Sequence, residues 1–130
     1  MKKTFLIHLV VFCFSFSLSA QEIIQLDVKP FLSELAEQKG TLVDVRTTSE
    51  FSQDHIKNAI HIDFLQSARF DQKFSEIDKS APVFLYCAAG GRSNAAAQKL
   101  KNMGFFKIYE LKGGFSNYKK ISLKNEIENY

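Results

Sequence analysis

Cysteine and histidine are scarce in this sequence, and tryptophan is absent from it. The 130 residues include two Cys, three His and no Trp. Neither His55 nor His61 has a second His or a carboxylate at a spacing typical of metal ligands, so the sequence predicts no metal site. Internal repeats, low-complexity segments and interdomain linkers are also missing. A composition of 45% hydrophobic and 24% charged residues is typical of globular proteins, and the length suits one domain with one core.

The apolar run near the N-terminus is too short for a membrane anchor. It covers residues 5–16, whereas a spanning helix needs roughly 20 apolar residues. Lys2 and Lys3 precede the run, and the small residues Ser17, Ser19 and Ala20 follow it. A basic start, an apolar middle and a small-residue end form the order of a secretory signal. We therefore predict a signal peptide over residues 1–20 that is cleaved at Ala20, and export to a bacterial periplasm or to the outside of the cell.

Loss of this signal would change both the charge and the cysteine count. Without Lys2 and Lys3, the 17 basic residues become 15 against 14 acidic ones, a net charge of +1 instead of +3. With no basic stripe left, we expect no nucleic-acid partner, and we expect no membrane span after cleavage. Cys13 would also leave, so the mature domain, residues 21–130, would keep Cys87 alone and form no internal disulfide. A lone cysteine of this kind is a buried apolar residue, an intermolecular partner or a reactive thiol.

Strand patterns alternate with helix patterns along the mature chain. The expected strands are 23–26, 42–45, 59–62, 82–86 and 106–111, and helices are expected after Pro30, Thr47 and Ser93. Residues 63–80 have apolar positions at loosely helical spacing without clear caps, so helix and loop are expected there. The segment 82–86 is apolar throughout, as in a central strand that helices cover on both faces. The alternation predicts an α/β domain with a mostly parallel sheet of about five strands, flanked by helices.

Cys87 falls at the carboxyl end of the strand 82–86, the place where parallel sheets bind ligands. The segment that leads from it into the next helix consists of Ala88, Ala89, Gly90, Gly91, Arg92 and Ser93. Small residues and two glycines let successive N–H groups point inward as a nest for an anion. The dipole of the following helix and the charge of Arg92 add positive potential. We therefore expect the pKa of Cys87 to lie below its ordinary value of about 8.5.

Four motifs resemble those of the rhodanese (sulfurtransferase) family. Residues 87–93 are similar to the family's Cys-x-x-Gly-x-Arg-Ser active-site loop. The other three motifs are Leu42-Val43-Asp44-Val45-Arg46 with Glu50-Phe51, His55-Ile56-Lys57-Asn58-Ala59-Ile60, and Leu111-Lys112-Gly113-Gly114-Phe115. They occur in the family's order and define a motif-bearing core of about 35–120. Three departures leave the cysteine loop intact: Asp54 replaces a Gly, Lys57-Asn58 replaces Pro-Gly, and Tyr118 stands where Trp is common.

The resemblance implies a single rhodanese-like domain that transfers sulfur in two steps. Cys87 would attack the outer sulfur of thiosulfate or a similar donor, release sulfite and hold a persulfide. A thiol, or cyanide in an assay, would then accept that sulfur, and a protein acceptor is possible. Backbone N–H groups of residues 88–93 would stabilise the persulfide, and Arg92 would attract the anionic donor. The chemistry requires no cofactor.

Two other functions are compatible with a cysteine loop. Cys-dependent phosphatases and arsenate reductases place five residues between Cys and Arg, whereas four separate Cys87 from Arg92, and a shorter loop encloses less space. The second alternative is a non-catalytic rhodanese-like module that carries persulfide or only binds a partner. The presence of Cys87 does not separate that module from an enzyme.

Several polar residues outside the loop receive structural interpretations. Asp44 and Arg46 follow a neighbouring strand, where they could pair with each other or brace the loop. Glu50 is expected to cap a helix because it stands three positions after Thr47. Lys112 could add positive potential over the mouth of the site, although an exposed lysine is the simpler interpretation.

Overall fold

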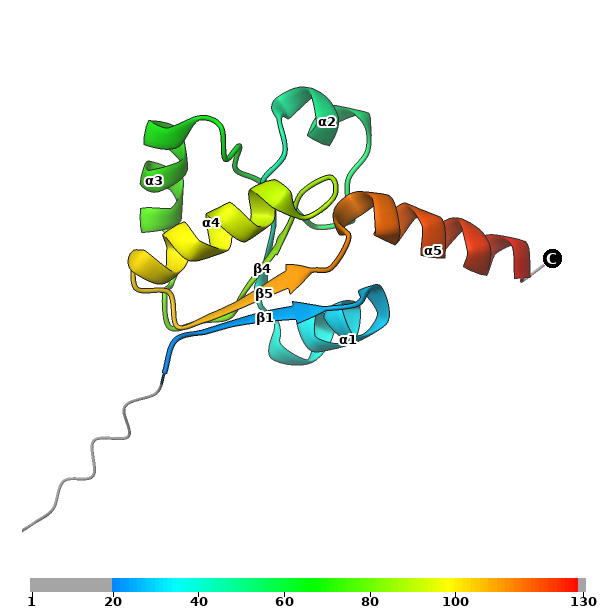
Figure 1. Ribbon diagram of the computed structural model, residues 1–130, viewed down its shortest axis with the longest axis horizontal. Coiled ribbons are helices and arrows are strands. Elements are labelled where there is room, and N and C mark those ends of the chain that lie inside the picture. Colours follow the sequence, from blue (N-terminus) through cyan, green and yellow to red (C-terminus); the bar gives the residue numbers. More distant parts are fainter. Residues whose placement is uncertain (1–19, 129–130) are drawn as a thin grey trace, which may run out of the picture.

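The computed structural model describes residues 20–128 (Figure 1). The predicted signal peptide, apart from Ala20, lies outside the described residues, and so does Cys13. Five strands alternate with five helices in the described part: β1 Glu22–Leu26, α1 Val28–Gln38, β2 Thr41–Asp44, α2 Thr48–Gln53, β3 Ile60–His61, α3 Ser67–Ser75, β4 Val83–Tyr86, α4 Gly91–Asn102, β5 Lys107–Leu111 and α5 Gly114–Glu128. No helix within residues 20–128 combines the length and apolarity that crossing a membrane requires.

All five strands are parallel and form one sheet in the order β1-β5-β4-β2-β3. The strand β4 lies in the middle with all four residues buried, as its apolar sequence predicts. The predicted α/β fold with five strands is therefore confirmed. Since parallel strands end at the same edge, the residues that follow β2, β3 and β4 gather at one side of the sheet.

Helices cover both faces of the sheet (Figure 1). On one face, Phe70 and Phe74 of α3 and Leu100 of α4 pack against Val83 and Leu85 of β4. On the opposite face, α1 and α5 pack against the alternate residues of the strands, which are Phe84 and Tyr86 in β4, Leu42 in β2 and Tyr109 in β5. This alternation along β4 joins the two hydrophobic clusters through one strand.

Two elements differ from the expectation. The third strand has only two residues, Ile60 and His61, because Ala59 donates its N–H to the Ile56 carbonyl in a turn at 3.0 Å instead of pairing in the sheet. The final helix, α5, continues to Glu128, in a part of the sequence where no helix is expected. Phe115, Tyr118 and Ile121 recur at intervals of three and pack on the same hydrophobic cluster, which supports the helix.

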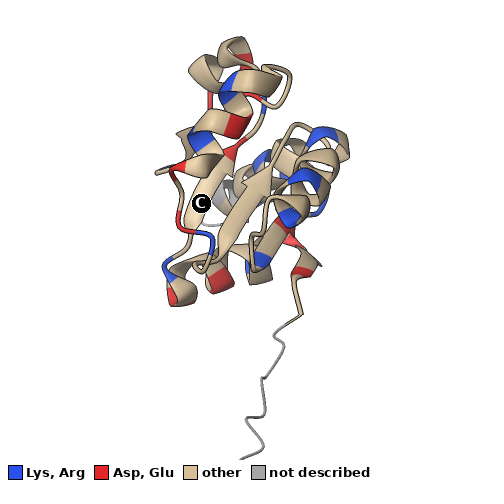
Figure 2. Cartoon of the chain, turned by 90° about the vertical axis from the view of Figure 1, so that its left-hand side faces the viewer, with Lys and Arg blue, Asp and Glu red and all other residues tan. Residues whose placement is uncertain are grey.

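Acidic and basic residues share the surface. Figure 2 shows both signs of charge on one face of the molecule. Two exposed or half-exposed ion pairs connect elements at the surface. Lys99 of α4 pairs with Asp71 of α3, and Lys119 of α5 pairs with Asp54 in the loop after α2. Such pairs contribute little each to stability, typically about 0–1 kcal/mol, so burial of the two clusters is the main source of stability.

Candidate functional site

Cys87 lies where the sequence predicts it, directly after β4, with only 1% of its surface exposed. The chain then turns at Gly90, whose φ of +116° falls in the left-handed region that favours glycine. The turn brings the Gly90 N–H to 3.0 Å from Cys87 Sγ, so that the backbone donates a hydrogen bond to the sulfur. Gly91, Arg92 and Ser93 form the first turn of α4, which places the positive end of that helix beside the sulfur.

The pKa of Cys87 is the balance of opposing effects. Burial raises it, because a desolvated thiolate is costly. The Ser93 hydroxyl and the N–H groups of Ser93, Gly90 and Ala89 lower it by hydrogen bonding to the charged sulfur, and the net shift is downward. The direction is the one that the sequence predicts. The nest of N–H groups therefore favours the thiolate form of Cys87.

The first residues of α5 close over the Cys87 loop. The N–H of Phe115 donates to the Cys87 carbonyl at 2.8 Å, and that of Ser116 donates to the Ala88 carbonyl at 3.0 Å. Gly114 makes this contact possible: a Cβ there would lie 2.5 Å from the Cys87 oxygen, and its φ is +61°. The turn 112–114 thus holds the backbone of the nucleophile in place from the opposite side to α4.

Arg92 forms a salt bridge with the carboxylate of Glu50. Its two terminal nitrogens lie 2.7 and 2.8 Å from the oxygens of Glu50, in a bidentate pair that is about one quarter to one third exposed. Hydrogen bonds from Arg92 lower the pKa of Glu50, against burial, and Glu50 raises the pKa of Arg92 in turn. Glu50 also forms the predicted capping box with Thr47. It therefore ties α2 to the first turn of α4, a role that its capping position does not reveal.

Asp44 and Arg46 pair with each other, one of the two roles that the sequence allows. Arg46 Nη2 lies 2.6 Å from Asp44 Oδ2, and the two side chains are 5% and 0% exposed. The same Nη2 donates to the Asp54 carbonyl at 2.7 Å, and the guanidinium lies 4.1 Å from the centre of the Phe115 ring. The pair therefore braces both the loop after α2 and the start of α5.

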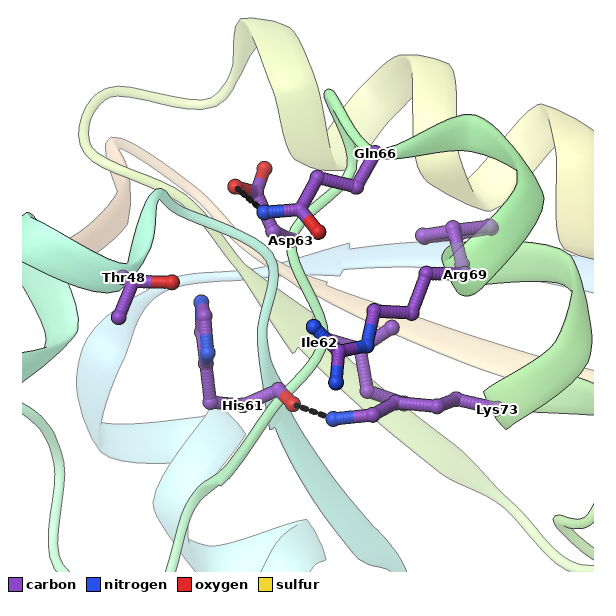
Figure 3. Close-up of a pocket in the computed structure, with 8 residues that line it drawn as sticks. Thr48, His61, Ile62, Asp63, Gln66, Arg69 and Lys73 are labelled. Atoms are coloured by element: carbon purple, nitrogen blue, oxygen red, sulfur yellow. Dashed lines mark hydrogen bonds between the residues drawn. The ribbon is translucent and has the colours of Figure 1, made fainter.

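A small basic pocket lies at the end of β3, on the same edge of the sheet (Figure 3). Lys73 donates to the His61 carbonyl at 3.2 Å, and Arg69 points toward Ile62. Thr48, Asp63 and Gln66 complete its polar lining, and its volume of about 40 Å³ is large enough for a few water molecules. Arg69 and Lys73 come from α3, within the segment 63–80 that the sequence leaves poorly defined. In the described part of the chain, no group of three His, Cys, Asp or Glu residues could hold a metal ion.

Comparison with known proteins identifies the family. The protein-family model of the rhodanese-like domain matches residues 27–121. The chain belongs to the rhodanese-like domain family. Its cysteine loop, Cys87 to Ser93, lies within the matched residues.

Curated relatives cover most of the domain. The thiosulfate sulfurtransferase GlpE of Vibrio cholerae (strain M66-2) is 32% identical over 109 residues, which are 79% of this chain and 94% of that protein. GlpE of Coxiella burnetii (strain RSA 493) is 34% identical over 87 residues, which are 66% and 78% of the two chains. The YqhL protein of Bacillus subtilis is 42% identical over 81 residues, 62% of either chain.

Solved structures agree on the fold. The rhodanese-like domain of an Anabaena protein superposes with a TM-score of 0.66 and 30% identity, covering 75% of this chain and 74% of that one. The human single-domain sulfurtransferase TSTD1 superposes with a TM-score of 0.63 at 20% identity, covering 74% and 95%. The second likeness concerns the fold alone.

Proposed function

We propose that this protein transfers sulfane sulfur through a persulfide on Cys87, with thiosulfate or a similar small anion as donor. The observation that carries the proposal is the hydrogen bond of 3.0 Å from the Gly90 N–H to Cys87 Sγ, within a loop that has four residues between Cys87 and Arg92. Such a nest stabilises the thiolate that attacks, and it equally stabilises the persulfide anion that results. Relatives named thiosulfate sulfurtransferase support this choice of chemistry.

The sulfur transfer consists of two displacement steps, and atoms and electrons balance in each. In the first, the Cys87 thiolate attacks the outer sulfur of thiosulfate. A new S–S bond forms, the S–S bond of thiosulfate breaks, and sulfite leaves with the bonding electron pair. In the second, an acceptor thiolate or cyanide attacks the outer sulfur of the persulfide, and Cys87 is released as a thiolate. Neither step needs a cofactor.

A persulfide carrier with little turnover on small molecules is the second candidate. It is favoured by the bidentate pair of Arg92 with Glu50, because the guanidinium is already neutralised where an anionic donor would approach. Phosphatase chemistry is less well supported, since the loop is one residue shorter than Cys-x5-Arg.

The test is a thiosulfate–cyanide assay with mass spectrometry of the intact protein, using Cys87→Ser as control. We expect thiocyanate production and a mass gain of one sulfur after incubation with the donor, both lost in the Ser variant. A mass gain without turnover would indicate the carrier. If neither signal occurs in the wild type, the sulfur-transfer proposal is wrong.

We further propose that the protein is exported by a signal peptide over residues 1–20, to a bacterial periplasm or beyond the cell. The order of Lys2-Lys3, apolar run and small residues supports this proposal. Expression of the full chain in a bacterial host, followed by fractionation and N-terminal sequencing, tests it. We expect an exported product that begins at Gln21. Retention of Met1 in the cytoplasmic fraction would refute export.

A further inference from the structure

Glu110 is a carboxylic acid in the core, 2% exposed, between the buried Tyr109 and Leu111 of β5. In the register of β4 with β5 it is paired with Leu85. Successive residues of a strand face opposite sides, so Leu85 and Cys87 lie on the same side of the sheet as Glu110. Cys87 follows β4 directly and lies diagonally across from Glu110, at a Cα separation of about 8 Å for strands about 4.8 Å apart with a rise of about 3.3 Å per residue, which side chains can bridge.

The first turn of α4 covers both groups. Ser93 is fully buried, and its side chain lowers the pKa of both Cys87 and Glu110 as a potential hydrogen-bond donor to each charged form. Its hydroxyl also lies 3.1 Å from the Gly90 carbonyl, as a donor. Among the described residues, the hydrogen bond that reaches the carboxylate comes from Asn94, with Nδ2 at 3.4 Å from Oε1. A hydroxyl has one hydrogen to donate, so Cys87, Glu110 and Gly90 compete for it.

The charged groups around this cluster are already paired. Arg92 of α4 faces Glu50 of α2, and Arg46 faces Asp44 after β2. Tyr86 points to the opposite face of the sheet. On the side of β1, Gln25 is the uncharged register partner of Glu110. Among residues 20–128, no Lys, Arg or His forms an ion pair with Glu110, and burial raises the pKa of its carboxyl.

We infer that Glu110 is a positioning residue that controls, through the hydroxyl of Ser93, how readily Cys87 ionises. With Glu110 protonated, Ser93 is free to donate to the thiolate. With Glu110 ionised, Ser93 turns to the carboxylate, and Cys87 loses a donor and gains a negative neighbour. The two acids therefore titrate as a coupled pair, each holding the other's proton more tightly. The inference rests on the proposed role of Cys87 as the reacting thiolate.

The rate of Cys87 alkylation by iodoacetamide as a function of pH tests this coupling without any sulfur transfer. We expect Glu110→Gln, which keeps the shape but cannot ionise, to lower the midpoint by at least about half a pH unit, or about threefold in the ionisation constant. Glu22→Gln, the same change at an exposed site on β1, should leave the midpoint in place. Superimposable curves for wild type and Glu110→Gln would overturn the inference.

Two further measurements test whether Ser93 transmits the effect of Glu110, and whether the coupling is present when Glu110 itself is unchanged. In a Ser93→Ala background, Glu110→Gln should shift the midpoint at least threefold less than it does in wild type. An undiminished shift would overturn the role of Ser93. Titration of the Glu110 carboxyl carbon by NMR, with Glu110 intact, should give a lower midpoint in Cys87→Ser than in wild type, because coupling is reciprocal. An unchanged midpoint contradicts the pair, whatever the sulfur-transfer assay gives.

Discussion

At Cys87, burial and hydrogen bonding act on the pKa of one sulfur in opposite directions. Burial alone would make an inert thiol, as in most core cysteines. The N–H groups of Ala89, Gly90 and Ser93, with the Ser93 hydroxyl, reverse the sign. The reactivity of Cys87 therefore depends on a few hydrogen-bond donors, and removal of any of them should raise its pKa.

Removal of the Ser93 hydroxyl should raise the pKa of Cys87. A hydrogen bond to a charged group is worth about 1.5–3 kcal/mol, so Ser93→Ala is expected to shift the pKa upward by about one to two units. The alkylation rate of Cys87 at neutral pH should fall accordingly, and a full pH profile measures the shift. Ser116→Ala, an exposed serine next to the loop, is the control and should leave the profile unchanged.

The buried pair of Asp44 and Arg46 should be costly to break. Asp44→Ala would leave the Arg46 guanidinium buried without its carboxylate, which typically costs about 3–5 kcal/mol. Urea unfolding followed by circular dichroism should show this loss. As the matched control, Asp27→Ala removes the exposed partner of Lys112 and should leave the urea midpoint nearly unchanged. Equal effects of the two substitutions would contradict the burial argument.

At the scale of elements, the site is a junction of helix ends and strand ends. The helices α2, α4 and α5 all begin near the carboxyl edge of the sheet, where β4 delivers Cys87 (Figure 1). Glu50 connects α2 to α4, and Gly114 lets α5 reach the backbone of the loop. Substitutions at these two positions should disturb the junction in different ways.

Gly114→Ala should separate α5 from the cysteine loop. The new Cβ would meet the Cys87 oxygen at 2.5 Å, and alanine would also be strained at a φ of +61°, a backbone cost of about 1–3 kcal/mol before any steric overlap. We expect a lower urea midpoint together with slower alkylation of Cys87. Gly91→Ala is the matched control for stability, since no atom outside its chain neighbours and the backbone of its own helix lies within 4 Å of its Cβ position. A stable Gly114→Ala protein would show that the close approach is not required.

The pair of Glu50 with Arg92 should make stability depend on pH in a defined window. The pKa of Glu50 is lowered on folding, so the pair stabilises the protein fully above the ordinary value of about 4.3 and is lost as pH falls below it toward the folded value. Urea midpoints of wild type and Glu50→Gln should therefore differ more at pH 7 than at pH 3. Partial exposure limits the difference to a fraction of that expected for a buried pair. The same difference at both pH values would rule out this linkage.

On the scale of the whole molecule, one sheet supports two hydrophobic clusters. Because adjacent residues of β4 belong to opposite clusters, neither cluster can lose its strand without the other. The domain should therefore unfold as one unit. The absence of Trp makes circular dichroism the appropriate probe.

Truncation of either cluster should lower one common transition. Phe31→Ala on the α1 face and Phe74→Ala on the α3 face remove fully buried rings, each at a cost of about 3–5 kcal/mol. Thermal unfolding should remain a single step with a lower midpoint in both variants. Leu65→Ala, at a residue 64% exposed, is the control and should hardly change the midpoint. Two separate transitions in either variant would contradict the shared strand.

The sequence by itself determined the features that neighbouring residues fix. An apolar run predicted β4, Thr47 and Glu50 predicted the start of α2, and small residues with glycines predicted the nest around Cys87. The α3 helix stayed poorly defined because no Pro, Gly or capping side chain marks either of its ends, whereas Pro30 lies in the first turn of α1, Gly40 follows that helix and Gly104 follows α4. The sequence marks a helix locally only where residues that start or stop helices stand at its ends.

Only the tertiary structure decided which distant side chains meet. Arg92 pairs with Glu50 across 42 positions, and the sheet register sets Glu110 beside Cys87 across 23. Nothing in the local pattern around β5 distinguishes a buried Glu110 from an exposed one, because burial follows from the order of the strands. The nucleophile was thus encoded locally, whereas the groups that tune its charge depend on the packing of the whole sheet.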